Sequence, residues 1–285
     1  MPRPLFAIHL TFPPLADRPD LPDLLAAALD DFGVAAVHEA GDDHQPFWRV
    51  FLSDQARVAD AAARLRADWT TAGCAIDVVE VDDEDWAARS QADLRHVTVG
   101  GLIVAPPWDV PASAGPDTRV IVIQPSMGFG TGHHETTRLC LRLLQRLDLR
   151  GRRVIDVGTG SGVLAIAAAR LGASSVEGVD FDEDALQSAR ESVALNEVDD
   201  VVALRQADIR SDRLEPADLV MANLTGALLV AEAANLLRLL RPGGALIVSG
   251  YQDIESDHVV SSFAPRLSQV TRLAEHDWEA LLGLL

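Results

Sequence analysis

The stretch Asp156-Val157-Gly158-Thr159-Gly160-Ser161-Gly162 decides the fold. A short apolar strand pattern, Val154–Val157, runs into it, and an apolar helix pattern, Val163–Leu171, follows it. Three glycines at alternate positions allow a sharp turn and leave no side chains where a ligand must approach the backbone. The helix behind the turn directs its free N–H groups at a bound molecule. This strand–turn–helix unit predicts a nucleoside-binding site at the edge of a parallel sheet.

Strand and helix patterns alternate regularly from Arg152 onward, which predicts a parallel sheet with helices on both faces. Near the C-terminus, Gln269–Leu273 and Trp278–Leu282 are strand-like runs across a short polar turn, and they indicate an antiparallel hairpin at the sheet edge. We therefore expect an α/β, doubly wound domain over residues 101–285. Its other elements are expected at Ser175–Asp180, Glu183–Leu195, Val201–Ala207, Leu219–Ala222, Thr225–Leu240 with a closing turn at Arg241–Gly244, and Ala245–Ser249.

The N-terminal patterns follow the order strand, helix, strand, strand, helix, strand, which predicts a small ferredoxin-like α+β domain over residues 1–82. A unit of this kind more often binds a partner than catalyses a reaction. Residues 83–100 are expected to form a helical linker. The expected elements are Leu5–Thr11, Asp20–Asp31, Val34–Glu39, Phe47–Ser53, a helix from Asp54 to about Gly73, Ala75–Val81 and a linker helix at Asp85–His96.

Acidic side chains outnumber basic ones, 43 to 24, for a net charge of −19, and residues 1–90 carry 17 acidic and 7 arginine side chains. An acidic surface repels phosphate, so we expect no direct nucleic-acid binding and a basic protein as partner. The acidic run at Glu80 and Asp82–Asp85 fits either a solvated helix start or a face that attracts a basic polypeptide. The chain has no lysine, which excludes a Walker A loop and a pyridoxal Schiff base.

The remaining composition excludes several other classes. Cys74 and Cys140 stand apart without CxxC spacing, so neither a disulfide framework nor a zinc knuckle is expected. His133, His134 and Glu135 lack the HExxH spacing of a zinc protease, and we expect no metal. No apolar run approaches the roughly 20 residues that span a bilayer, and the N-terminus does not resemble a signal peptide. We expect a soluble cytoplasmic protein that makes no contact with membranes.

The spacing of the glycines and carboxylates indicates which cofactor binds. Asp180 ends the next strand pattern, 22 residues after Gly158, where a carboxylate can accept hydrogen bonds from both ribose hydroxyls of an adenosine. The spacing is Gly-x-Gly-x-Gly, whereas a dinucleotide site needs Gly-x-Gly-x-x-Gly beside a pyrophosphate. Asp156 stands where an ammonium group finds a negative partner, which favours S-adenosylmethionine. A nicotinamide-dependent oxidoreductase is the alternative from a different class.

Two further polar residues complete the expected pocket. Asp208 follows the third strand pattern, where a side chain can reach the adenine amino group. Asn223 ends the fourth strand pattern, at the edge where open α/β sheets bind ligands. Its amide can accept a hydrogen bond from an incoming amine, and as an isolated residue it equally fits the N-cap of the next helix.

Residues 127–137, MGFGTGHHETT, combine glycine, threonine and histidine, which indicates a ligand-covering loop followed by a helix. The strings FGTGHHETT (129–137), DVGTGSGVLAIAAARLGA (156–173), GVD (178–180) and ANL (222–224) resemble the ribosomal protein L11 methyltransferase family. Linker residues Asp85-Trp86, Val99-Gly100 and Pro106-Pro107-Trp108 extend the resemblance over nearly all of residues 85–285. The N-terminal part resembles the family in layout rather than in residues.

This resemblance implies a class I methyltransferase with a Rossmann-like sheet, which transfers methyl groups from S-adenosylmethionine to lysine side-chain and N-terminal amines of ribosomal protein L11. The small domain would grip the substrate, and the linker would let the catalytic domain swing. Matching positions imply cofactor contacts at Thr137, Gly158, Asp180 and Asn223, with Thr131 and Gly132 in a loop over the methionine end. The full expected cofactor-binding set is Thr131, Gly132, Thr137, Asp156, Gly158, Gly160, Asp180, Asp208 and Asn223, with Asn223 also the catalytic residue that orients the amine.

The chain departs from the usual family pattern at the edge that faces the methyl acceptor. His133 and Glu135 replace a threonine and a proline, and Leu224–Ala227 differs from the family's sequence after the asparagine. A methyltransferase of the same fold that acts on another protein, such as the electron-transfer flavoprotein β-subunit, or on a small molecule is therefore a second hypothesis. A binding module without catalysis conflicts with the intact set of Asp180, Asn223 and the Thr131 loop.

Overall fold

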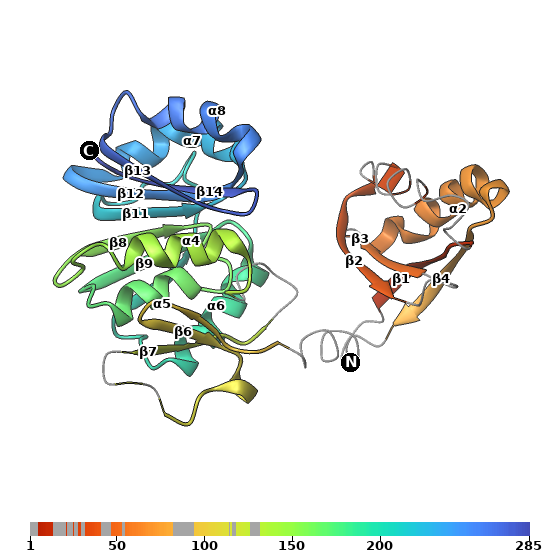
Figure 1. The fold of residues 1–285 in the computed structure, drawn as a ribbon, viewed down its shortest axis with the longest axis horizontal. Coiled ribbons are helices and arrows are strands. Elements are labelled where there is room, and N and C mark those ends of the chain that lie inside the picture. Colours follow the sequence, from red (N-terminus) through yellow and green to blue (C-terminus); the bar gives the residue numbers. More distant parts are fainter. Residues whose placement is uncertain are drawn as a thin grey trace. The chain divides into compact units, whose positions relative to one another are not determined.

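The computed structural model describes residues 5–13, 21, 25, 28–29, 32–40, 47–52, 55–81, 94–113, 115, 118–125 and 132–285. The chain divides into two compact units, Met1–Ala92 and Asp93–Leu285 (Figure 1). The predicted linker, residues 83–100, and its helix Asp85–His96 lie largely outside the described residues. Within that range Leu94–His96 is not helical, and Val97–Val99 is a strand of the second unit.

The first unit contains a four-stranded antiparallel sheet in the order β2-β3-β1-β4. Its elements are β1 (Leu5–Thr11), β2 (Val34–Ala40), β3 (Phe47–Leu52), η2 (Gln55–Arg57), α2 (Val58–Trp69), η3 (Thr70–Ala72) and β4 (Ala75–Val81). Alternate strand residues such as Ile8 and Leu10 enter a core with α2. Of the predicted helix Asp20–Asp31, the described Leu21, Leu25 and Leu29 are helical and buried. This strand order is that of the predicted ferredoxin-like domain.

The second unit contains a seven-stranded sheet in the order β10-β9-β8-β11-β12-β14-β13. Five strands are parallel, and β14 pairs antiparallel with both β12 and β13. The strands are β8 (Arg153–Val157), β9 (Ser175–Asp180), β10 (Val202–Gln206), β11 (Ala217–Asn223), β12 (Leu240–Gln252), β13 (Ser268–Glu275) and β14 (Trp278–Leu284). The doubly wound sheet with an antiparallel edge hairpin is therefore confirmed.

Two hydrophobic cores lie on the two faces of this sheet because the strand residues alternate between them. On β8, Val154 packs with α4, α5 and α6, whereas Ile155 packs with α7 and α8. The helices are α4 (Glu135–Leu144), α5 (Val163–Arg170), α6 (Glu183–Leu195), α7 (Gly226–Arg238), η5 (Asp253–Glu255) and α8 (Ser256–Phe263). Figure 1 shows α7 and α8 together beside β12.

Two features of the second unit differ from the sequence-based prediction. A three-stranded sheet of β5 (Val97–Val99), β6 (Leu102–Ala105) and β7 (Arg119–Val122) precedes α4, with η4 (Pro107–Asp109) between β6 and β7. Strand β12 begins at Leu240, and the predicted turn Arg241–Gly244 is a bulge inside it, because Leu240 and Ala245 both pair with β11 in parallel register. The positive φ of Gly243 accommodates this bulge.

Candidate functional site

A cavity of about 700 Å³ opens at the carboxyl ends of the parallel strands of the second unit. The loop after β8, the ends of β9, β10 and β11, the first turns of α4 and α7, and Trp278 at the start of β14 line it. Open α/β sheets bind ligands at this edge, since the strand order reverses there and leaves a crevice. The sheet therefore places the predicted glycine turn and Asn223 on one cavity.

The turn after β8 brings backbone rather than side chains to the cavity. Gly158 has a φ of 69°, and an added Cβ would collide with Leu224 on the opposite side. The N–H groups of Gly158 and Thr159 donate to the carbonyl oxygen of Val179 at 2.8 and 3.0 Å, which fastens the turn to β9. Glycine is required at 158 for both conformation and space.

Asp180 lies beside this turn at the end of β9 and is half-buried in the cavity wall. Its Oδ2 accepts the N–H of Gly160 at 3.0 Å, and its Oδ1 accepts the N–H of Asp182 at 3.1 Å. These two bonds hold the carboxylate in one orientation and leave further lone pairs for ribose hydroxyls. Gly158, Gly160 and Asp180 together form what we call the cofactor wall.

Asp156, predicted to contact the cofactor, is not among the residues that line the cavity. Its buried carboxyl accepts the hydroxyl of Thr159 at 2.8 Å, and burial raises its pKa to about 7. The carboxyl therefore stabilises the glycine turn by this hydrogen bond.

Asp208 does line the cavity, but the Arg210 guanidinium contacts both of its carboxylate oxygens. These hydrogen bonds lower the pKa of Asp208 to about 2.

Asn223 belongs to a chain of polar contacts on the other side of the cavity. Its Nδ2 donates to Thr136 Oγ1 at 3.2 Å, and the backbone N–H of Thr136 donates to His134 Nδ1 at 3.3 Å. His134 Nδ1 also lies 2.9 Å from Thr136 Oγ1. The imidazole packs edge-on against Trp278, with ring centroids 4.7 Å apart. We call His134, Thr136, Asn223 and Trp278 the acceptor wall, after the role expected of Asn223.

These contacts indicate which ring nitrogen of His134 is protonated and how the Asn223 amide is oriented. His134 Nδ1 accepts from Thr136, so the neutral imidazole carries its proton on Nε2. Within the described part of the chain the Asn223 amide nitrogen donates to Thr136, which is compatible with the expected use of Oδ1 as an acceptor. Sequence reasoning identified Asn223 but missed His134, Thr136 and Trp278, because their contacts join three elements distant in sequence.

The predicted loop before α4 is only partly described. Thr137 is buried on α4 and lines the cavity. Thr131 lies outside the described residues, and Gly132 is not among the cavity-lining residues; its φ of 85° and its contact with Val104 of β6 leave no room for a side chain. Phe181, which sequence reasoning also missed, lines the cavity with an exposed ring that can stack on a purine.

Neither a metal centre nor a membrane span is found among the residues that the structure describes. No group of three or more His, Cys, Asp or Glu side chains there could hold a metal ion. None of the described helices is both long enough and apolar enough to cross a bilayer. Both cysteines are buried, and neither forms a disulfide bond.

The strand order and the cavity at the carboxyl edge define the fold of the class I S-adenosylmethionine-dependent methyltransferases. The residues fit this cofactor, because the turn at Gly158 admits no Cβ and Asp180 presents an oriented carboxylate. Residues 35–284 match the family described as Ribosomal protein L11 methyltransferase (PrmA), and the chain belongs to that family.

Known relatives agree with this assignment. The chain is 41% identical over 212 residues to a ribosomal protein L11 methyltransferase of Bacillus cytotoxicus, covering 73% of this chain and 67% of the relative. It is 38% identical over 215 residues to one of Geobacillus kaustophilus, covering 73% and 68%. A solved ribosomal protein L11 methylase of Lactobacillus delbrueckii subsp. bulgaricus matches with a TM-score of 0.62 and 29% identity, over 67% of this chain and 98% of that one. The oxidoreductase alternative is not favoured.

Proposed function

We propose that this chain methylates amines of ribosomal protein L11, both lysine side chains and the N-terminal α-amine. The position of Asn223 carries the proposal, since it lines the cavity and its Nδ2 is engaged by Thr136, so that Oδ1 is the amide atom we assign to accept from an amine. The names of the relatives in Bacillus and Geobacillus support L11 as the acceptor. A ribosomal protein as substrate makes the cytoplasm the place of action.

The nucleophile in this reaction must be a neutral amine. A lysine side chain in water has a pKa of about 10.4 and is almost wholly charged near neutral pH. Removal of the amine from water disfavours its charged form, and an adjacent cation does so further. The acceptor wall supplies the apolar surface of Trp278 for this desolvation. The amine then loses its proton to solvent, and no dedicated base is needed.

Asn223 orients the neutral amine for an in-line attack. An N–H of the amine donates to Oδ1, and the nitrogen lone pair is thereby directed along the cavity. S-adenosylmethionine, when bound, supplies the methyl group on a sulfonium. Positioning of the two reactants by fixed side chains can provide about 7–11 kcal/mol of the barrier reduction. His134 and Thr136 contribute by holding the amide in one orientation.

We further propose that residues 1–82 of the first unit bind the protein substrate and that the residues between 83 and the start of β5 serve as the linker. The first unit has its own core, and the N-terminal third holds much of the acidic charge. Opposite charges attract over about 10 Å at 0.1 M salt. We expect the KM for L11 to rise with ionic strength while the affinity for S-adenosylhomocysteine stays constant. A KM independent of salt contradicts the electrostatic part of this proposal.

Incubation with labelled S-adenosylmethionine and unmethylated L11, followed by mass spectrometry of the product, tests the function. We expect methyl groups on lysine side chains and on the N-terminal amine of L11, formed about 10²–10³ times more slowly by the Asn223→Ala variant. The enzyme has no lysine of its own, so labelled lysine arises only from the substrate. A bacterial lysate included as competitor identifies any preferred acceptor, and label on another polypeptide in place of L11 refutes the proposal.

A further inference from the structure

We propose that Arg138 is a positioning residue that holds the acceptor wall in place for methyl transfer; this inference rests on the proposed function. Arg138 lies on α4, one turn after His134, and it is not among the residues that line the cavity. Its side chain is 16% exposed. It therefore acts on the reaction only through the residues that it contacts.

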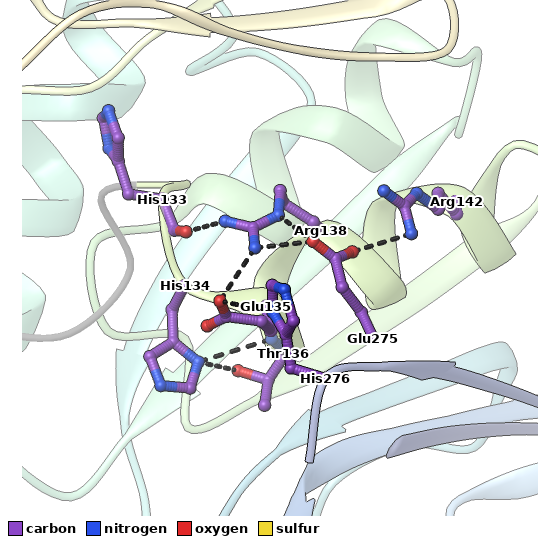
Figure 2. Close-up of polar contacts among 8 residues, drawn as sticks. All are labelled: His133, His134, Glu135, Thr136, Arg138, Arg142, Glu275 and His276. Atoms are coloured by element: carbon purple, nitrogen blue, oxygen red, sulfur yellow. Dashed lines mark hydrogen bonds and ion pairs between the residues drawn. The ribbon is translucent and has the colours of Figure 1, made fainter. Parts of the chain in front are cut away.

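The guanidinium of Arg138 joins three separate groups (Figure 2). Its Nε and Nη2 donate to Oε1 of Glu275 at 2.7 and 2.6 Å. Nη2 also lies 3.0 Å from Oε1 of Glu135, and Nη1 donates to the carbonyl oxygen of His133. The guanidinium fork makes these contacts from three separate nitrogens in a fixed plane, a geometry that the single nitrogen of an ammonium group cannot reproduce.

These contacts connect two of the three elements that carry the acceptor wall, α4 and β14. Glu275 is the last residue of β13, and Trp278 is the first residue of β14, so the turn between them is short. Arg138 forms an ion pair with Glu275 at the start of this turn, and the His134 ring packs on Trp278 at its end. The β13–β14 turn is thus fixed to the first turn of α4 at two points.

The carboxylates around Arg138 are themselves constrained. Arg142 lies 2.7 Å from Oε2 of Glu275, and His276 lies 3.3 Å from Oε1 of Glu135 (Figure 2). The side chains of Glu135 and Glu275 are 25% and 18% exposed, so salt screens these pairs less than fully exposed ones. Loss of Arg138 would release the carbonyl of His133 and loosen the first turn of α4, and Thr136 would then hold the Asn223 amide less firmly.

Turnover and cofactor affinity of Arg138→Met test this role. We expect kcat to fall about 10-fold to 100-fold, since a shift of about 1 Å at a reacting group has effects of that size. The Kd for S-adenosylhomocysteine should change less than 3-fold, because the cofactor wall is untouched. Arg138→Lys keeps the charge but not the fork, so we expect it to restore thermal stability without restoring kcat.

Arg142→Met is the matched control, because Arg142 contacts the same Glu275 but neither His133 nor Glu135. We expect its kcat to stay within about 2-fold of the wild type. Glu275→Ala should lower kcat, and the double variant with Arg138→Met should be no worse than Arg138→Met alone, since coupled residues are not additive. Wild-type kcat in Arg138→Met, or full recovery of kcat in Arg138→Lys, overturns the proposal.

A second readout needs no methyl acceptor. Imidazole ¹⁵N NMR of His134, assigned with a His134→Gln variant, should show the Nε2-protonated tautomer in the wild type and tautomer exchange in Arg138→Met. If the wild type fails to methylate L11, the proposed function falls, while the tautomer still tests the positioning role. An unchanged tautomer in Arg138→Met contradicts it.

Discussion

The cofactor wall and the acceptor wall face one cavity but are constructed differently. The cofactor wall consists of backbone that turns at Gly158 and of Asp180, which is held by backbone N–H groups. The acceptor wall consists of side chains from α4, β11 and β14, joined only by contacts between those elements. The first is determined by local sequence and the second by tertiary packing. We therefore expect substitutions in the two walls to have separable effects on affinity and on turnover.

Asn223→Ala should have the largest effect on turnover. The variant lacks the oxygen that orients the amine, and removal of one preorganised group lowers kcat by about 10²–10³. The affinity for S-adenosylhomocysteine should stay within a few-fold, which steady-state kinetics and calorimetry measure together. Unchanged turnover would remove Asn223 from the mechanism.

Gly158→Ala should have the largest effect on cofactor affinity. The added Cβ would collide with Leu224 and push it into the cavity, so we expect the Kd for S-adenosylhomocysteine to rise about 100-fold, the equivalent of about 3 kcal/mol. Gly151→Ala is the control, because Gly151 has a similar φ of 73° but open space around its Cβ position. Equal loss of affinity in both variants would mean that backbone strain rather than space is decisive.

The cofactor wall and the strands that carry it could be predicted from the sequence. The glycine turn, Asp180 and the edge hairpin are encoded by short contiguous patterns, and strand β9 and helix α6 have the bounds that those patterns predict. The β5-β6-β7 sheet was missed because its strands have only three or four residues each. The bulge in β12 was missed because Pro242 and Gly243 have the sequence signature of a turn.

Of the four residues of the acceptor wall, only Asn223 could be predicted from the sequence. Thr136 lies 87 positions before Asn223 in the sequence, and the hydrogen bond between them cannot be inferred from a helical or strand pattern. His134 belongs to the predicted loop, and no sequence pattern singles out Arg138 or Glu275. The cofactor contact of Asp156 stays a prediction: its carboxyl accepts from Thr159 and is not among the residues that line the cavity.

Thr136→Val should have a smaller effect than Asn223→Ala. Valine has nearly the same shape but cannot accept from the Asn223 amide, and one such hydrogen bond contributes about 1 kcal/mol, or about 5-fold in rate. We expect kcat to fall by that amount without a change in cofactor affinity. The double variant with Asn223→Ala should be no slower than Asn223→Ala alone, and additive losses would show that Thr136 acts independently.

Asp156→Asn should affect stability in a pH-dependent way. The carboxyl has a pKa of about 7 in the folded chain and about 3.9 when unfolded. The folded state therefore holds a proton that the unfolded state releases, and stability falls as pH rises from about 4 to 7. The melting temperature of the wild type should decrease between pH 5 and pH 8 by about 4 °C more than that of the variant. Parallel curves would contradict the raised pKa.

Competitive equilibrium binding tests the adenosine site most directly. The wild-type chain is titrated calorimetrically with S-adenosylhomocysteine, alone and in excess NADH. The two titrations compare the affinity of the site at the glycine turn for the two ligands. We expect micromolar binding of S-adenosylhomocysteine that NADH does not displace. Tight binding of NADH with no heat from S-adenosylhomocysteine would contradict the assignment of the cofactor wall and, with it, the methyl transfer.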